Sequence, residues 1–144
     1  MTPRVRELRI VYAPVKHAGP LLQVGRPADA AACLREQLAS EPVEVCFVLL
    51  LDTRHRVRAV HCVGRGTVDR CPVHPRDVFK AAVLANAAAV IVGHNHPSGD
   101  PTPLPDDVAL CERLRHAAAI LGIGLLDFVV IGDGAYYSFQ EQGR

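Results

Sequence analysis

The sequence predicts an α/β domain in which a mixed β-sheet is flanked by helices. Runs rich in Val, Ile and Leu predict strands, segments with a 3.6-residue apolar period predict helices, and turns rich in Gly, Pro and Asp separate them. These elements follow one another in the order β-α-β-β-α-β-α-β-β, which is typical of helices packed on a sheet.

Length and composition are those of one ordinary globular domain, and we expect a single domain over residues 1–144. Apolar residues make up 49% of the chain and charged residues 22%, which suits a compact core. No apolar run approaches the roughly 18 residues of a membrane span, and the first residues lack the apolar stretch of a signal peptide. Five scattered cysteines without a CxxC pair argue against a disulfide framework. We therefore expect a cytoplasmic protein without membrane contact.

The first part of the chain predicts one helix and three strands. Residues 5–12 alternate apolar and polar side chains, which predicts a strand, and a loop and then a helix over 27–39 follow. Residues 43–51 (VEVCFVLLL) end in a continuous apolar run, which is typical of a strand covered on both faces. Residues 57–63 alternate again and predict the hairpin partner of that strand.

The middle of the chain predicts a helix, a short buried strand and an ordered loop. Residues 77–88 carry the helical period, and residues 89–93 (AVIVG) predict a strand that stops at His94. Four prolines, one glycine and no helical period predict an ordered loop over residues 94–105.

The last part predicts a long helix and a hairpin. Asp106 or Asp107 caps the helix, which runs to about residue 121 before a glycine. Strands over 125–131 and 135–139 flank Gly-Asp-Gly, which is a hairpin signal.

Two histidines leave the end of the predicted strand, separated by one residue. Side chains two residues apart in extended backbone point the same way, so His94 and His96 can converge on one point. Asp107 begins the next helix, and the prolines between stiffen the loop that brings it back to the strand end. Two nitrogens and one carboxylate oxygen, with a fourth position open, form the ligand set of a catalytic zinc site. Asp100 competes as a ligand, but its GDPT context favours a turn former.

A zinc site of this kind needs a general base that is not itself a ligand. Glu44, at the start of the central strand, is the best candidate. A carboxylate there is either exposed at the strand end or aimed into a cleft, and the residues alone favour the exposed position. Glu36 and Glu41 are weaker candidates, because one lies on a predicted helix face and the other precedes a proline.

The loop sequence resembles a known signature. Residues 94–103 (HNHPSGDPTP), followed by Asp107, are similar to the signature of RadC-like domains in the JAB/MPN (JAMM) superfamily. Residues 48–52 (VLLLD), 73–80 (VHPRDVFK) and 125–134 (LLDFVVIGDG) resemble the same family. The resemblance runs from about residue 26 to residue 140. It is to the stand-alone form, without the helix-hairpin-helix segment that often precedes this domain.

The resemblance implies a JAB/MPN-like fold, with the layered architecture also found in cytidine deaminases. It implies a zinc-dependent peptidase or isopeptidase that acts on a protein or peptide substrate. Carried over residue by residue, His94, His96 and Asp107 hold Zn²⁺. Glu44 becomes the catalytic base, which takes the proton of a water and returns it to the leaving amine.

One position departs from the family pattern. The serine that the pattern has three residues before the aspartate falls on Leu104, which offers no hydrogen-bond donor. Losing one donor to the oxyanion costs on the order of 100-fold or more in rate. Ser98 lies near in sequence, but a local hydrogen bond in its own turn is the simpler expectation. The alternative function is therefore a catalytically impaired domain that serves as a scaffold or binding module.

Other classes have less support. The RadC name carries an association with DNA repair, but 16 basic and 15 acidic residues give a net charge of +1, which does not favour nucleic acid as a partner. The main basic concentration, at Arg54, Arg56 and Arg58, is predicted to be a solvated strand face. A zinc nucleobase deaminase ranks last because the chain lacks the cysteine pair and the HxE or CxE element. The sequence carries no signal of an oligomeric state.

Overall fold

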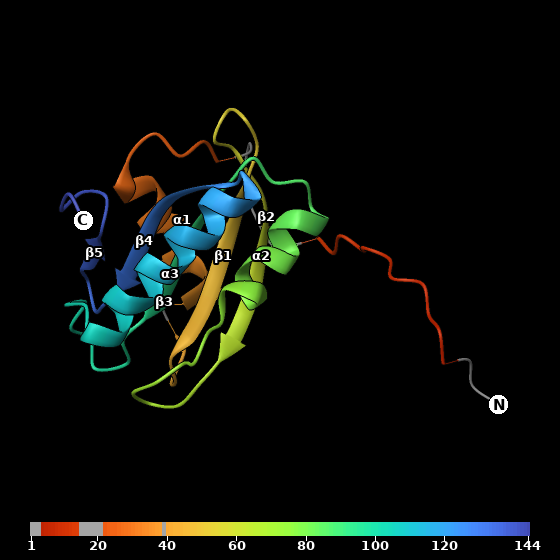
Figure 1. Ribbon diagram of the computed structural model, residues 1–144. Helices are drawn as coiled ribbons and strands as arrows, with labels where there is room; N and C mark the ends of the chain where they lie inside the picture. The colour runs from red at the N-terminus through yellow and green to blue at the C-terminus, as the bar shows by residue number, and fades with distance from the viewer. Residues whose placement is uncertain (1–3, 15–21, 39) are drawn as a thin grey trace.

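The computed structural model describes residues 4–14, 22–38 and 40–144, and within them the chain forms three layers (Figure 1). The strands are β1 (Val45–Leu51), β2 (Val57–Arg65), β3 (Ala89–Asn95), β4 (Gly124–Ile131) and β5 (Tyr136–Ser138). The helices are α1 (Pro27–Leu38), α2 (Pro75–Leu84) and α3 (Pro105–Leu121). The strands form one mixed sheet in the order β2-β1-β3-β4-β5. The predicted α/β class, with helices on both faces of a mixed sheet, is confirmed.

Sheet pairing follows from the lengths of the connections. Short turns join β1 to β2 and β4 to β5, and both of these pairs are antiparallel. Strands β3 and β4 are parallel, and α3 provides the crossover that parallel pairing requires. The central strand β1 also pairs antiparallel with β3, so that Cys46 lies opposite His94.

The core is divided into two by the sheet. On one face, apolar side chains from alternate strand positions pack against α2 and α3, and on the other face they pack against α1. This double coverage explains why β1 is almost continuously apolar, as its sequence predicted. Helix α1 approaches the sheet closely at Gly93, where an added Cβ would lie 2.4 Å from Leu34 Cδ1.

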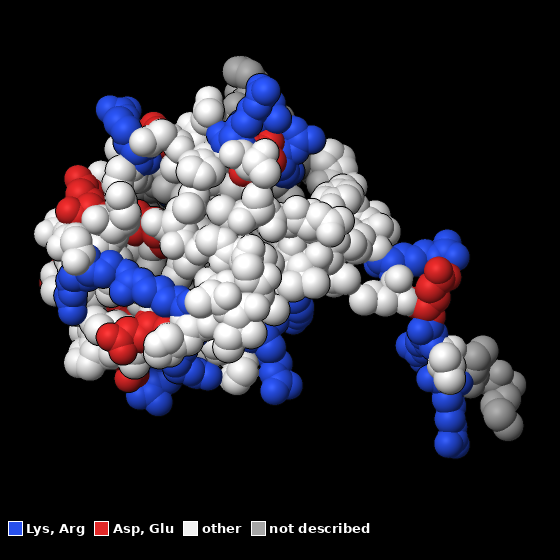
Figure 2. All heavy atoms as spheres, turned by 45° about the horizontal axis from the view of Figure 1, so that its top comes forward, with Lys and Arg blue, Asp and Glu red and all other residues white. Residues whose placement is uncertain are grey.

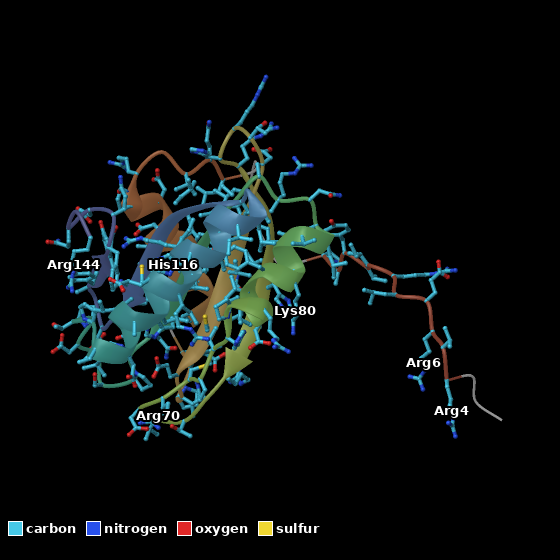
Figure 3. The ribbon with its side chains drawn as sticks, in the orientation of Figure 1. Arg4, Arg6, Arg70, Lys80, His116 and Arg144 are labelled. Carbon is cyan, nitrogen blue, oxygen red and sulfur yellow. The ribbon has the colours of Figure 1, made fainter. Side chains whose placement is uncertain are left out.

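The strand predicted over residues 5–12 does not form. Residues 4–14 run away from the body of the domain, with Arg4 and Arg6 far from it (Figures 1 and 3). Val5, Leu8 and Val11 are 90%, 74% and 86% exposed. An alternating segment becomes a strand only when a neighbour takes its backbone hydrogen bonds. Most of the loop predicted next, residues 15–21, lies outside the described residues.

Several predicted boundaries move. Helix α2 ends at Leu84 rather than at residue 88, because Asn86 adopts a left-handed φ of 52° and the chain turns into β3. Strand β3 continues through Asn95, so His94 lies inside the strand rather than after it. The hairpin predicted at Gly-Asp-Gly is confirmed, with the Gly132 N–H donating to the Ala135 carbonyl at 2.8 Å.

Among the described residues, no helix is long and apolar enough to cross a membrane.

Candidate metal centre

The end of β3 aims two imidazoles at the layer formed by α2 and α3. His94 packs on Phe128 at 5.4 Å between ring centroids, and it is 3% exposed. The His96 backbone N–H donates to the Ile131 carbonyl at 2.9 Å, which keeps the chain extended one residue beyond the strand. The two imidazoles therefore lie on the same side, with ring centroids 5.0 Å apart.

The loop after His96 is held in place by the turn between β4 and β5. Gly99 adopts a φ of 89°, which favours glycine, and its carbonyl accepts from the Asp133 N–H at 2.7 Å. Contact between the loop and the turn is close, because a Cβ on Gly132 would lie 2.4 Å from the Gly99 carbonyl oxygen. The predicted stiff loop is thus held by neighbouring backbone as well as by its prolines.

Asp107 faces both histidines from the first turn of α3. Its Oδ1 lies 2.9 Å from His94 Nε2, and its Oδ2 lies 3.2 Å from His96 Nε2. Oδ2 also accepts the Leu104 N–H at 2.7 Å. The prediction that Asp106 or Asp107 caps the helix is wrong by a few residues, because Leu104 is the N-cap. Asp107 instead sits one turn into the helix and accepts the N-cap N–H.

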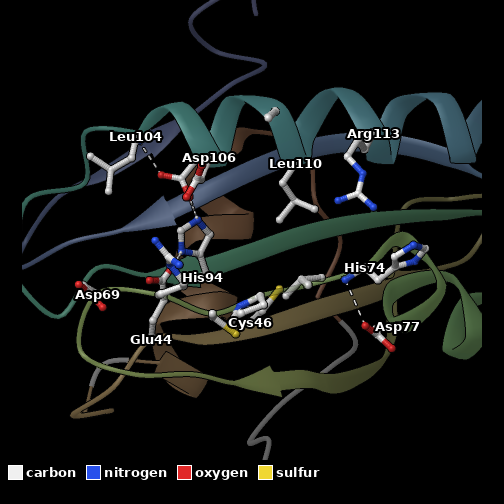
Figure 4. Close-up of a pocket in the computed structure, with 16 residues that line it drawn as sticks. Glu44, Cys46, Asp69, His74, Asp77, His94, Leu104, Asp106, Leu110 and Arg113 are labelled. Atoms are coloured by element: carbon white, nitrogen blue, oxygen red, sulfur yellow. Dashed lines mark hydrogen bonds and ion pairs between the residues drawn. The ribbon is translucent and has the colours of Figure 1, made fainter.

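Glu44 completes the cluster from the residue before β1 (Figure 4). It is 7% exposed, and its Oε1 lies 2.6 Å from His94 Nδ1. The exposed position that the residues alone favoured is therefore wrong. One ligand atom from each of Glu44, His94, His96 and Asp107 lies within 4.8 Å of the others.

Asn95 is a residue of this site that sequence reasoning missed. Its Oδ1 accepts the Val45 N–H at 2.8 Å, and its Nδ2 donates to the Val43 carbonyl at 2.9 Å. These two hydrogen bonds hold the backbone on both sides of Glu44. The alternation of the strand carried a signal for it, because a residue between two histidines that face one way must point the other way.

The hydrogen bonds of the imidazoles leave both Nε2 atoms facing one carboxylate. His96 Nδ1 donates to the Asp100 carbonyl at 2.9 Å, so its Nε2 carries the lone pair in the neutral ring. His94 Nδ1 faces Glu44, and its buried Nε2 has no hydrogen-bond partner although Asp107 lies beside it. An Nε2 lone pair and a carboxylate oxygen repel each other at these distances, so a metal ion or a proton must lie between them. The cluster can therefore hold a metal ion, and in its absence a proton takes that role.

The contacts between imidazoles and carboxylates also shift the pKa values of the residues in the cluster. Burial lowers the pKa of His94, but Asp107 and Glu44 outweigh burial and raise it to about 9. Asp107 raises the pKa of His96. Burial raises the pKa of Asp107, but the two histidines outweigh it, and the net shift is downward.

The other predicted candidates do not join the cluster. The Asp100 carboxylate accepts from the Thr102 N–H and hydroxyl at 3.0 and 2.7 Å, as a turn former does. Ser98 Oγ accepts the Asp100 N–H at 3.3 Å, which is the local bond expected of it. Glu41 pairs with Arg65, and Glu36 lies on α1 at the opposite face of the sheet.

A cleft of about 710 Å³ opens beside the cluster. One wall is the loop after β2 and the start of α2, and the other wall is α3 (Figure 4). Glu44 and His94 lie at one end of it, and Asp107, which contacts His94, also lines it. Leu104 also lines the cleft, with its side chain 53% exposed and its N–H already given to Asp107. Such a volume suits a small ligand or a segment of peptide.

The basic residues singled out in the sequence lie at the surface. Arg54 and Arg58 are exposed, and Arg56 pairs with Asp52 at 2.8 Å. On the face shown in Figure 2, Lys and Arg atoms lie in separate groups divided by uncharged surface.

Comparison with known proteins gives a consistent result. A family model described as the RadC-like JAB domain matches residues 24–144. A UPF0758 protein of Xylella fastidiosa is 43% identical over 132 residues, which cover 89% of this chain and 59% of that protein. A UPF0758 protein of Shouchella clausii is 42% identical over 120 residues, covering 83% and 52%. A third, of Thermotoga maritima, is 49% identical over 101 residues, covering 70% and 46%. The chain spans about half the length of the curated relatives it matches.

Proposed function

The chain belongs to the RadC-like JAB domain family, and from this premise we propose that it is a zinc-dependent hydrolase in which water attacks a peptide or isopeptide carbonyl. The observation that carries the proposal is the convergence of His94, His96, Asp107 and Glu44. All of these but His96 also line the cleft. The buried Nε2 of His94, which lacks a hydrogen-bond partner, is the atom that most needs a cation.

The donor set suits zinc. His94 and His96 offer nitrogen and Asp107 offers oxygen, which are the donors of three-ligand zinc sites. Zinc held by these residues would supply Lewis acidity, lowering the pKa of a water and polarising a carbonyl. The hydrogen bonds of the Nδ1 atoms to Glu44 and to the Asp100 carbonyl orient both rings and fix their tautomers.

Glu44 is the carboxylate that remains for proton transfer. It is buried, it lines the cleft, and its contact with His94 keeps it turned toward the cluster. We assign it the role of general base, which takes the proton of the attacking water and delivers it to the leaving amine nitrogen. A general base or acid of this kind contributes about 10²–10⁴-fold in rate.

The first test is metal content, measured by elemental analysis after loading with zinc and desalting. We expect about one zinc per chain from the one-ion ligand set, loss of that zinc in His96→Ala, and retention in Glu44→Gln. His116→Ala, which removes an exposed histidine of α3, is the matched control and should keep the ion. A peptide library would then be screened, with Glu44→Gln expected to lose about 10²-fold or more. Wild-type protein that takes up no zinc would overturn the proposal.

Leu104 favours a second candidate, a binding module with impaired catalysis. Neither its apolar side chain nor its backbone N–H, which is bonded to Asp107, can donate to an oxyanion. If that donor limits the rate, Leu104→Ser should raise hydrolysis by on the order of 100-fold without changing zinc content. Leu121→Ser, an exposed leucine at the far end of α3, is the control and should change nothing. Zinc binding without hydrolysis in either wild type or Leu104→Ser would favour the binding module.

A further inference from the structure

The cleft leads from the metal cluster to an arginine. Asp107, Leu110 and Arg113 are spaced three residues apart on α3, so each is a neighbour of the next on the helix surface, and all of them line the cleft. Figure 4 shows the Arg113 guanidinium projecting from α3 into the cleft, beyond Leu110 and opposite His74. The two ends of the cleft therefore differ in chemistry.

Arg113 has no anionic partner in the part of the chain that the structure describes. None of the ion pairs among the described residues involves Arg113. The candidate partner across the cleft would be Asp77, which also lines it. Asp77 is already engaged, since it accepts the His74 N–H at 3.1 Å and lies 3.8 Å from Lys80 Nζ. Arg113 is exposed where it lines the cleft, and its unpaired guanidinium is suited to bind a carboxylate through two parallel hydrogen bonds.

The rest of the lining sets the direction in which a bound chain would lie. Carboxylates gather around the cluster, where Asp69 and Asp106 join Glu44 and Asp107, and Arg70 next to Asp69 also lines the cleft. Between the two ends, the lining is largely apolar, with Val73 and Leu110 on opposite walls. Complementary charge fixes the register of a ligand, so a peptide would place its negative group at the unpaired guanidinium of Arg113.

Spacing along the helix gives the position of that negative group. Arg113 lies six positions after Asp107 on α3, which corresponds to about 9 Å along the helix axis. An extended peptide advances about 3.3 Å per residue, so about three of its residues span this distance.

We propose that this cleft selects peptides carrying a carboxylate about three residues from the bond that is hydrolysed, and that Arg113 binds this carboxylate. The carboxylate is that of an acidic side chain or of the peptide C-terminus. This inference rests on the proposed function for the meaning of the scissile bond, but carboxylate binding by Arg113 does not require turnover.

Fluorescence anisotropy tests carboxylate binding first, with the zinc-loaded Glu44→Gln variant of this chain and N-terminally labelled alanine hexapeptides. A single Glu would be moved along an amidated peptide, with Gln at the same position as the uncharged reference, and an unamidated all-Ala peptide would supply a free C-terminus. We expect a Glu or free-carboxylate peptide to bind about 10-fold or more tightly than its neutral counterpart, as for a charge-assisted hydrogen bond. The amidated and unamidated arms distinguish the two sources of the carboxylate.

Variants of Arg113 then assign the effect. Arg113→Ala should remove the preference, and Arg113→Glu should reverse it in favour of the same peptide carrying Lys. Arg115→Ala is the matched control, because Arg115 lies two residues further along α3 and does not line this cleft. Equal binding of Glu and Gln peptides, or an unchanged preference in Arg113→Ala, would overturn the inference.

Two further arms separate this inference from the proposed function. Acidic peptides that bind through Arg113 but are not hydrolysed by wild type would support carboxylate binding by Arg113 and contradict the proposed hydrolase function. Hydrolysis without preference for acidic peptides would support the hydrolase function and contradict carboxylate binding by Arg113. A single-stranded oligothymidine that binds through Arg113 while acidic peptides do not would overturn the assignment to peptides.

Discussion

At the scale of single residues, the site is organised by where each imidazole places its proton. His94 and His96 both direct Nδ1 to an oxygen and Nε2 toward Asp107. The two oxygens differ, since His94 faces a carboxylate and His96 faces a backbone carbonyl. Burial lowers the pKa of His94, but pairing with the two carboxylates of Asp107 and Glu44 outweighs burial and raises it. In each ring, Nδ1 makes the contact that holds the ring in place, and Nε2 is the atom that faces Asp107.

Asn95→Ala should destabilise the protein and loosen the position of Glu44. It removes the partners of the Val43 carbonyl and the Val45 N–H, and each buried group left unsatisfied costs about 1–3 kcal/mol. We expect the free energy of unfolding to fall by about 2–4 kcal/mol in urea titrations of the metal-free protein, given these costs. Gln23→Ala, which removes an exposed amide bonded to the Arg54 carbonyl, is the control and should change it by less than about 0.5 kcal/mol. An equal effect of both changes would contradict the role given to Asn95.

At the scale of elements, neighbouring segments hold the site. The turn between β4 and β5 packs on the loop after His96 through Gly99 and Gly132. The same turn is tied to α1, because Arg35 donates to the carbonyls of Gly132 and Ala135 at 2.9 and 3.0 Å. Helix α1 contributes no residue to the cluster, yet it supports the turn against which the loop rests.

Gly93→Ala tests how closely α1 must approach β3. The added Cβ would lie 2.4 Å from Leu34 Cδ1, so that the side chain or the helix must move, and overpacking of this kind costs about 1–3 kcal/mol. Thermal and urea unfolding would measure the loss. Combined with Leu34→Ala, the same change should cost less, because the clashing methyl groups are gone.

The matched control for that change is Gly124→Ala. Its Cβ would meet Ala89 Cβ at 3.7 Å, which is an ordinary contact, so we expect little change in stability. A cost at Gly124 as large as that at Gly93 would show that loss of backbone freedom, rather than the contact with Leu34, explains the effect.

At the scale of the whole molecule, the cluster joins parts of the chain that are distant in sequence. Glu44 precedes β1, the histidines end β3, and Asp107 begins α3. A metal ion held there would cross-link the sheet to the helical layer, and it would bind the folded state more tightly than the unfolded chain. Binding of this kind stabilises the fold by mass action.

Zinc should therefore raise global stability. At a free zinc concentration 100 times Kd, we expect the free energy of unfolding to rise by about 2.7 kcal/mol. A chelator should remove the increase, and His96→Ala should show none, while His116→Ala should behave like wild type. Stabilisation of His96→Ala equal to that of wild type would place the bound zinc elsewhere on the chain.

The sequence by itself determined the fold class, most of the elements and the grouping of two histidines with one aspartate. These depend on local periodicity and on short separations along the chain, since alternation in β3 and a stiff loop suffice to bring His94, His96 and Asp107 together. Local pattern failed at residues 5–12, where alternation is present but the described segment has no neighbouring strand to pair with.

The tertiary structure alone decided the burial of Glu44, the role of Asn95 and the facing of Arg113 into the cleft. Glu44 lies fifty residues before His94, and its burial depends on the pairing of β1 with β3 and on the two hydrogen bonds from Asn95. Arg113 faces the cleft because α3 packs with that side toward the loop after β2. Such contacts join residues far apart in the chain, and local sequence carries no signal of which distant side chain will occupy the same space.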